Sequence, residues 1–232
     1  QKKIRSGSEP HKKVKVDDHA KGTELDQLKH HSIVVADTGD FSLIEQYLPE
    51  DATTNPSLIL QAAKNPAFAK LIDESIDFSL ANLIPIKEKE EKGKNLSSLA
   101  LIDEDQQVEF IELVYDHLFV SFGKKILEKV KGYVSTEVDA KLSFNKNETV
   151  KRAKRIISLY EEMGVDTNRV LIKIASTWEG IKAGEALLKN KVKCNMTLVF
   201  HKIQAIACAK SKLFLISPLL AEYLIGSKNK PE

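Results

Sequence analysis

The stretch VLIKIASTWEG, residues 170–180, is the part of the sequence that decides the fold. Its first five residues are apolar apart from Lys173, as is typical of a strand buried on both faces. From Trp178 onward the apolar residues follow a helical period, so the stretch predicts a strand followed directly by a helix. A lysine inside such a strand is unusual, because lysine is rarely buried unless it is paired or functional.

The same alternation of strand and helix extends in both directions along the chain, and it predicts right-handed crossovers in a parallel sheet. Because no glycine-rich phosphate loop follows any strand, we expect an α/β fold, a parallel (β/α)8 TIM barrel of which about six βα units are present, and not a dinucleotide-binding fold. The predicted strands are residues 33–36, 52–54, 133–137, 170–174, 195–200 and 213–216. The predicted helices are residues 56–79, 106–130, 146–163, 178–189 and 202–209.

Two segments interrupt this alternation. Residues 1–30 are expected to form a basic N-terminal arm and a lead-in helix, and residues 31–232 the barrel domain. Within that domain, residues 82–105 contain the charge run KEKEEKGK and are interpreted as an exposed insertion. The basic clusters KKIR and KKVK of the arm could form a two-part nuclear-import signal, but we favour the alternative of a solvated arm.

Composition excludes several classes of protein. The 35 Lys and Arg residues balance 33 Asp and Glu residues to a net charge of +2, which is too even for a chain that wraps nucleic acid. No apolar run approaches the roughly 18 residues of a membrane span. Neither the six histidines nor Cys194 and Cys208 show metal-ligand spacing, so we expect no metal site. We expect reduced cysteines in the core of a cytoplasmic protein.

Polar residues cluster where the predicted strands end, and in a parallel barrel these ends open on one face that carries the active site. Burial would disfavour the charged form of Lys173 and leave a neutral amine that attacks carbonyl carbon. The alternative is a structural lysine in an ion pair with Glu137 or Asp139, and the pattern alone leaves both open. The residues at the strand ends are Asp37, Asn55, Glu137 with Asp139, Lys173, Asn195 with Thr197, and Ser217.

The carboxylates allow two interpretations as well. Asp37 and Glu137 are either general acid/base groups or caps of ordinary loops. Schiff-base chemistry moves protons when the carbinolamine forms and when the carbon–carbon bond breaks. Two positioned carboxylates, one of them acting through a water held by the Thr197 hydroxyl, would supply those transfers.

Six short motifs, taken together, resemble the transaldolase family. Their order and spacing match over roughly residues 23–218, apart from the insertion. The motifs are VVADTGD at 34–40, DATTNPSL at 51–58, VSTEVDA at 134–140, LIKIASTWEG at 171–180, CNMTL at 194–198 and ISP at 216–218.

The resemblance implies a role for each candidate residue. Lys173 would form a Schiff base with a ketose donor, and Glu137 would act as general acid/base through a water that Thr197 holds. Asp37 would take the proton from the hydroxyl at the bond being cleaved. The residues implied to bind substrate hydroxyls are Asn55, Asn195 and Ser217.

The implied reaction transfers a dihydroxyacetone unit from sedoheptulose 7-phosphate to glyceraldehyde 3-phosphate, in the pentose phosphate pathway. It needs no metal or organic cofactor, because the lysine imine is the electron sink. The resemblance also implies sugar-phosphate partners, a homodimer and a cytoplasmic location.

The sequence departs from the family pattern at two places. Glu222 stands where the family has an arginine that grips the substrate phosphate, and a carboxylate there would repel the phosphate. The seventh and eighth strands and a further arginine would lie beyond Glu232. The alternative function is therefore a catalytically impaired, truncated transaldolase-like protein that lacks the phosphate-binding arginines.

Overall fold

The computed structural model describes residues 22–83 and 104–218, with the side chains of residues 104 and 105 left out. These residues belong to two compact units that divide after Val34. In the first unit, helix α1 (Glu24–His31) begins at Thr23, whose hydroxyl accepts a hydrogen bond from the Asp26 amide at 3.2 Å. The basic clusters, the charge run and Glu222, all singled out in the sequence, lie outside the described residues.

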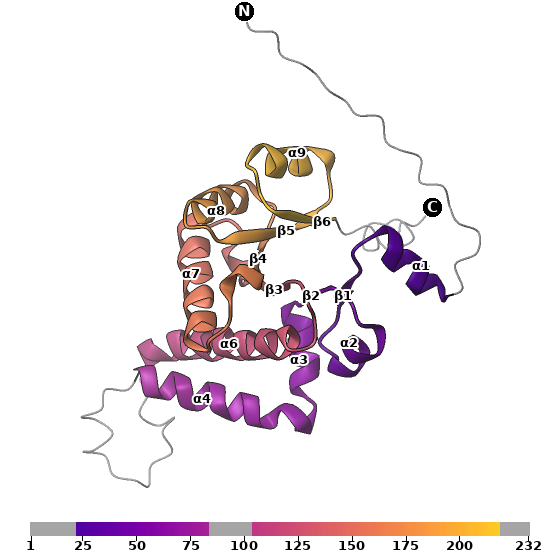
Figure 1. The fold of residues 1–232 in the computed structure, drawn as a ribbon. Coiled ribbons are helices and arrows are strands. Elements are labelled where there is room, and N and C mark those ends of the chain that lie inside the picture. Colours follow the sequence, from indigo (N-terminus) through magenta and orange to yellow (C-terminus); the bar gives the residue numbers. More distant parts are fainter. Residues whose placement is uncertain (1–21, 84–103, 219–232) are drawn as a thin grey trace, which may run out of the picture. The chain divides into compact units, whose positions relative to one another are not determined.

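The second unit is built on one parallel sheet of six strands in the order β1-β2-β3-β4-β5-β6 (Figure 1). Each strand pairs with the next one along the chain, and the six strands form a curled half-barrel. Helices connect consecutive strands. The predicted fold class, an incomplete α/β barrel, is therefore confirmed. The strands are β1 (Val35–Asp37), β2 (Asp51–Thr53), β3 (Val134–Glu137), β4 (Val170–Ala175), β5 (Lys193–Val199) and β6 (Leu215–Pro218).

The prediction of a single helix at residues 56–79 is wrong, because the helix is interrupted at Asn65 and Pro66. The Asn65 side chain accepts a hydrogen bond from the Ala67 amide at 3.0 Å and starts a 3-10 turn. Pro66 has no N–H to continue the preceding helix. The short helix α2 was not predicted. The helices of this unit are α2 (Phe41–Tyr47), α3 (Pro56–Ala63), η1 (Pro66–Phe68), α4 (Ala69–Leu83), α6 (Glu104–Leu127), η3 (Ala140–Leu142), α7 (Lys146–Glu162), η4 (Thr167–Arg169), α8 (Trp178–Lys189) and α9 (Lys202–Lys210).

The two faces of the sheet differ in chemistry. On the face toward the helices, Val134, Ile172 and Met196 are fully buried and pack with side chains of α6, α7 and α8. Burial of each such side chain contributes about 1.5–3 kcal/mol to folding. Because side chains alternate along a strand, the residues between these point to the opposite, concave face. That face receives the polar residues of the strands.

Helices of this unit begin close to the strand ends because polar residues cap them there. Asp40, Asn55, Thr177 and His201 each lie two or three residues after a strand and accept a backbone N–H of the following helix. Such a cap satisfies an amide that the helix itself leaves without a partner. The caps therefore fix the turns at the carboxyl edge of the sheet.

Both cysteines lie in the core, as predicted. Cys194 on β5 and Cys208 on α9 are buried free thiols. Burial raises the pKa of the Cys194 thiol to about 12, because the charged thiolate is disfavoured away from water.

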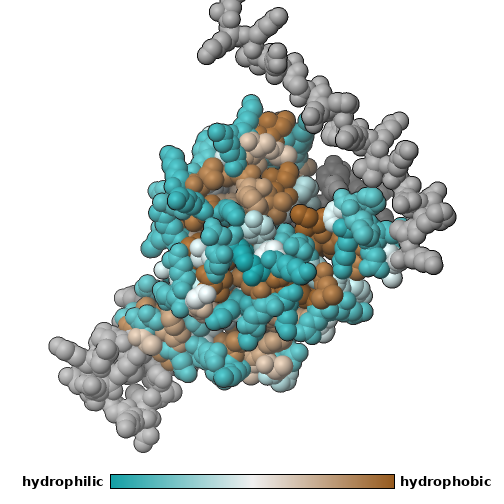
Figure 2. Space-filling model, viewed as in Figure 1, coloured by the Kyte–Doolittle hydropathy of each residue, from teal (hydrophilic) through white to brown (hydrophobic). Residues whose placement is uncertain are grey.

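The surface of the described residues is mixed. Polar residues cover most of the face seen in Figure 2, and hydrophobic residues gather in patches between them. Phe144 and Trp178, which follow β3 and β4, are mostly exposed. Within the described residues, no helix combines the length and apolar character needed to cross a membrane.

Helix α6 packs closely on β3 and α7 at Gly123. The Tyr160 hydroxyl is buried and lies 2.5 Å from the Thr136 hydroxyl. A Cβ atom on Gly123 would lie 1.7 Å from the Tyr160 oxygen, which is closer than atoms approach. Glycine at this position therefore permits the close contact between the two helices.

We expect Gly123→Ala to destabilise the protein by about 1–3 kcal/mol, because the overpacking cost exceeds the gain of up to about 1 kcal/mol in helix propensity. Urea denaturation followed by circular dichroism measures the difference. Glu109→Ala, at an exposed position of the same helix, should change stability by less than about 0.5 kcal/mol. A Gly123→Ala variant as stable as the wild type would show that the helices separate at little cost.

Candidate functional site

The sheet register brings the central candidate residues side by side. Glu137 on β3, Lys173 on β4 and Asn195 on β5 are direct neighbours across the sheet. Residues paired in this way share a face, so all three side chains lie on the concave side. Glu137 is the last residue of β3 and Lys173 lies in the carboxyl half of β4, so the site opens toward the edge where parallel barrels carry their active sites.

Lys173 is buried, with only 8% of its surface exposed. Its Nζ lies 3.2 Å from Glu137 Oε2 and donates a hydrogen bond to the Thr54 carbonyl oxygen at 3.3 Å. The ion pair with Glu137, which the sequence left as an alternative, is therefore present, whereas Asp139 pairs with Lys141. The pair is compatible with a nucleophilic lysine, because transfer of one proton within it leaves a neutral amine.

The surroundings of Glu137 shift its pKa. Burial raises the pKa of Glu137, and the charges of Asp37 and Asp139 raise it further. The Lys173 charge and hydrogen bond act in the opposite direction but do not cancel the effect of burial. A raised pKa makes a carboxyl group a stronger proton acceptor when it is ionised, which favours the general acid/base role.

Asn195 joins three strands through its side-chain amide. It is 1% exposed. Its Oδ1 accepts a hydrogen bond from the Ser217 hydroxyl of β6 at 2.8 Å, and its Nδ2 donates one to the Ser135 hydroxyl of β3 at 3.0 Å. The predicted residues Asn195 and Ser217 are therefore in direct contact beside Lys173.

The other three predicted residues stand at strand ends around this centre. Asp37 is the exposed last residue of β1, and its negative charge raises the pKa of Glu137. Asn55 caps α3 with its Oδ1, which accepts from the Leu58 amide at 3.0 Å. Thr197 is buried on β5. Among the described residues, the Asn55 amide nitrogen and the Thr197 hydroxyl have no hydrogen-bond partner in the protein, so both are available to a ligand.

Sequence reasoning missed two residues of this site, Ser135 and Thr54. Ser135 lies two positions before Glu137 on one strand, and this spacing places both side chains on the same face. That spacing was the available signal. Thr54 acts through its backbone carbonyl, which every residue carries, so no residue pattern could have identified it.

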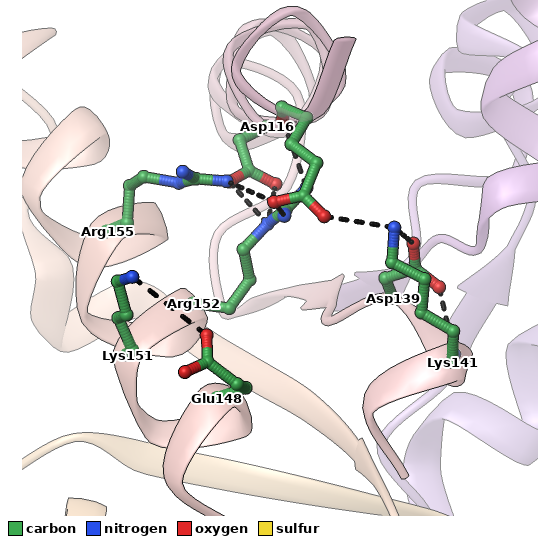
Figure 3. Close-up of polar contacts among 8 residues, drawn as sticks. Asp116, Asp139, Lys141, Glu148, Lys151, Arg152 and Arg155 are labelled. Atoms are coloured by element: carbon green, nitrogen blue, oxygen red, sulfur yellow. Dashed lines mark hydrogen bonds and ion pairs between the residues drawn. The ribbon is translucent and has the colours of Figure 1, made fainter. Parts of the chain in front are cut away.

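An ion-pair network between α6, α7 and η3 supports the loop that follows β3. Figure 3 shows Asp116 between Arg152 and Arg155, and Lys141 beside Asp139. Arg152 Nε lies 2.5 Å from Asp116 Oδ2. Burial raises the pKa of Asp116 although both guanidinium groups counteract it. Glu112 contacts both Arg152 and Lys141, so it links the buried pair to the loop carrying Asp139.

Other parts of the described chain show less chemistry. A hollow of about 530 Å³ lies beside α2 and α3, lined by residues such as Gly39, Gln61 and Phe68, and it does not include Lys173 or its partners. Across residues 22–83 and 104–218, no three His, Cys, Asp or Glu side chains are grouped so as to hold a metal ion. The Lys173 region therefore remains the candidate active site.

The structure is a parallel α/β half-barrel with a buried lysine and a carboxylate near the carboxyl ends of its strands. These features place the protein in the class of α/β-barrel proteins, whose active sites lie at those strand ends. The family described as "Transaldolase/Fructose-6-phosphate aldolase" matches residues 34–221. The chain belongs to this family.

Relatives named transaldolase agree with that family. The protein of Prochlorococcus marinus (strain MIT 9312) is 47% identical over 206 residues, which are 89% of this chain and 56% of the relative. Those of Cricetulus griseus and Homo sapiens are each 49% identical over 201 residues, 86% of this chain and 53% of the relative. The chain thus spans about half the length of the curated relatives it matches.

The network of Figure 3 yields a stability prediction. Arg152→Met should destabilise the protein by about 3 kcal/mol, the low end for a broken buried pair, because Arg155 remains beside Asp116. Arg155→Met is the matched control, since its side chain is 27% exposed against 7% for Arg152, and it should cost about 1 kcal/mol. Chemical denaturation measures both variants. A larger loss for Arg155→Met than for Arg152→Met would contradict this order.

Proposed function

We propose that this chain carries the Schiff-base half of transaldolase chemistry. Lys173 attacks the carbonyl carbon of a ketose phosphate and forms an imine, through which a dihydroxyacetone unit passes from sedoheptulose 7-phosphate to glyceraldehyde 3-phosphate. The observation that carries the proposal is the buried Lys173 amine, 3.2 Å from a carboxyl group whose pKa burial raises. The family and its relatives named transaldolase support the same reaction.

The Lys173–Glu137 pair explains how the amine becomes a nucleophile. Glu137 accepts a proton from Lys173, and the neutral amine then adds to the carbonyl carbon to give a carbinolamine. Glu137 returns the proton to the departing hydroxyl, directly or through a water held by the Thr197 hydroxyl, and water leaves as the imine forms. Burial raises the pKa of Glu137 and so favours the protonated carboxyl group that the first proton transfer produces.

The remaining residues take roles around the imine. Asp37 accepts the proton of the hydroxyl at the carbon–carbon bond that breaks, and its exposed position at the end of β1 leaves it open to substrate. The free amide nitrogen of Asn55 and the amide of Asn195 donate hydrogen bonds to substrate hydroxyls, and Ser217 supports Asn195. The electrons released by bond cleavage move into the imine, so no metal or organic cofactor takes part.

The family resemblance carries further proposals that concern the whole protein. We propose sugar-phosphate substrates of the pentose phosphate pathway, a homodimer and a cytoplasmic location. The basic clusters of residues 1–30 are proposed to belong to a solvated arm that precedes the barrel domain of residues 31–232, with a nuclear-import signal as the alternative. The charged insertion is proposed to lie between α4 and α6, since α4 ends at Leu83 and α6 begins at Glu104. A catalytically impaired relative is the alternative function, and it would form the imine without completing transfer.

Borohydride trapping tests the imine directly. Fructose 6-phosphate and the full chain should give a reduced adduct on Lys173, and because a modified lysine resists trypsin the label should lie on the peptide spanning residues 170–182. Lys173→Met should abolish the label. Lys193→Arg, on the neighbouring strand of the same face, should keep it. A label that survives in Lys173→Met would rule out the proposed nucleophile. Adduct formation without release of glyceraldehyde 3-phosphate would identify the impaired alternative.

The pH dependence of trapping tests Glu137. Below its raised pKa, Glu137 is protonated and cannot accept the lysine proton, so the cyanoborohydride trapping rate should fall with falling pH along a limb above 4.5, the ordinary glutamate value. In Glu137→Gln the limb should disappear and the rate should drop by about 100-fold or more. Asp139→Asn removes a charge that raises the Glu137 pKa, so its limb should move to lower pH. An unchanged limb in Glu137→Gln would exclude Glu137 as the titrating group.

A further inference from the structure

We infer that Ser135 is a positioning residue: its hydroxyl fixes the side-chain amide of Asn195 so that one amide N–H remains directed at the molecule bound to Lys173. This inference rests on the proposed function. Three observations carry it, namely the two tethers of Asn195, its register with Lys173, and the way in which Ser135 contacts two separate arms of the site.

The Asn195 amide is held at both ends. Its oxygen accepts from the Ser217 hydroxyl on β6 and its nitrogen donates to the Ser135 hydroxyl on β3, so the amide plane is fixed by strands on either side of β4 and β5. The terminal torsion of asparagine is otherwise broad. Without Ser135 the amide would turn about the single remaining contact with Ser217.

One hydrogen of the Asn195 amide remains unused. A primary amide nitrogen carries two hydrogens, and only one is taken by Ser135. Within the described residues, no other protein group accepts a hydrogen bond from the Asn195 side-chain nitrogen. Because Asn195 is the register partner of Lys173 on the same face, the second N–H is available to an oxygen of a molecule joined to the lysine nitrogen.

Ser135 also contacts a second arm of the site through its backbone. Its carbonyl oxygen accepts from the Thr54 amide at 3.2 Å and from the Thr54 hydroxyl at 3.1 Å. The Thr54 carbonyl in turn accepts from Lys173 Nζ. A change of side chain at position 135 removes the hydrogen bond to Asn195. It leaves the backbone hydrogen bonds that connect Ser135 through Thr54 to Lys173 in place. The side-chain contact with Asn195 can therefore be removed by mutation without removing the backbone contacts toward Lys173.

This separation defines the expected kinetic effect. Ser135→Ala should leave the lysine and its carboxylate where they are, so the maximal rate of imine trapping should stay within about twofold of wild type. The binding of fructose 6-phosphate should weaken, because the Asn195 donor is no longer oriented. We expect the half-saturating concentration to rise about tenfold, the effect of losing one well-placed hydrogen bond.

The test is cyanoborohydride trapping at varied fructose 6-phosphate concentration in the full chain. Ser135→Thr keeps a hydroxyl and should restore the wild-type half-saturating concentration. Ser158→Ala, at an exposed position of α7, is the matched control and should leave both parameters unchanged. Ser135→Cys, which is close in size but a weak acceptor, replaces the alanine variant if denaturation shows that the latter is unfolded.

A double-mutant cycle separates positioning from general support. If Ser135 acts through Asn195, the variant that combines Ser135→Ala with Asn195→Ala should bind no more weakly than Asn195→Ala alone. Additive losses, or a fall in maximal rate at unchanged half-saturation, would overturn the inference while the wild-type adduct still supports the proposed function. Failure of the wild type to form any adduct would overturn both.

Discussion

The buried contact between Lys173 and Glu137 is the constraint on which the rest of the site depends. A lysine and a glutamate in a partly dry interior are costly unless they meet, and the parallel register of β3 and β4 makes them neighbours. The register in turn depends on the apolar residues of the face that packs on the helices. A slip by one residue would turn Val134 and Ile172 to the concave face and both charged groups into the apolar core under the helices. The chemistry of the concave face and the packing of the convex face are thus fixed by the same strand pairing.

Besides the Thr54 carbonyl, which contacts Lys173 directly, more distant residues position the segments around this pair. Caps at the starts of helices set the turns at the carboxyl edge, so the loops that carry Asn55 and Thr177 leave the strands at fixed points. The buried Arg152–Asp116 pair and Lys141 keep Asp139 beside its own helix turn, where it raises the Glu137 pKa without replacing Glu137 as the partner of Lys173. Asp139 and Glu137 therefore have different ion-pair partners, Lys141 and Lys173.

The described strands and the turns that follow them contain every residue that the resemblance assigns to the lysine chemistry, from Asp37 on β1 through Asn55 after β2 to Ser217 on β6. In the proposed mechanism, proton transfer, imine formation and the binding of donor hydroxyls would all use residues of this one half-barrel. The family relationship is firm over residues 34–221, while the matched residues cover only 56% and 53% of the relatives from Prochlorococcus marinus (strain MIT 9312) and Cricetulus griseus. Imine formation and complete group transfer are consequently separate questions, and they are answered by different measurements.

The sequence by itself determined the strand–helix alternation and the parallel class, and it proposed most residues of the candidate site, because hydrophobic periodicity and strand ends are local properties that neighbouring residues express. It did not determine the break at Asn65 and Pro66, where a local cap prevails over an otherwise helical pattern. Nor could it choose between the two interpretations of Lys173. Only the tertiary structure decided that Glu137 and not Asp139 is its partner, that the Thr54 carbonyl contacts its amine, and that Ser135 tethers Asn195. These contacts join residues separated by 36 to 119 positions, so they depend on strand register, and no short window of sequence contains it.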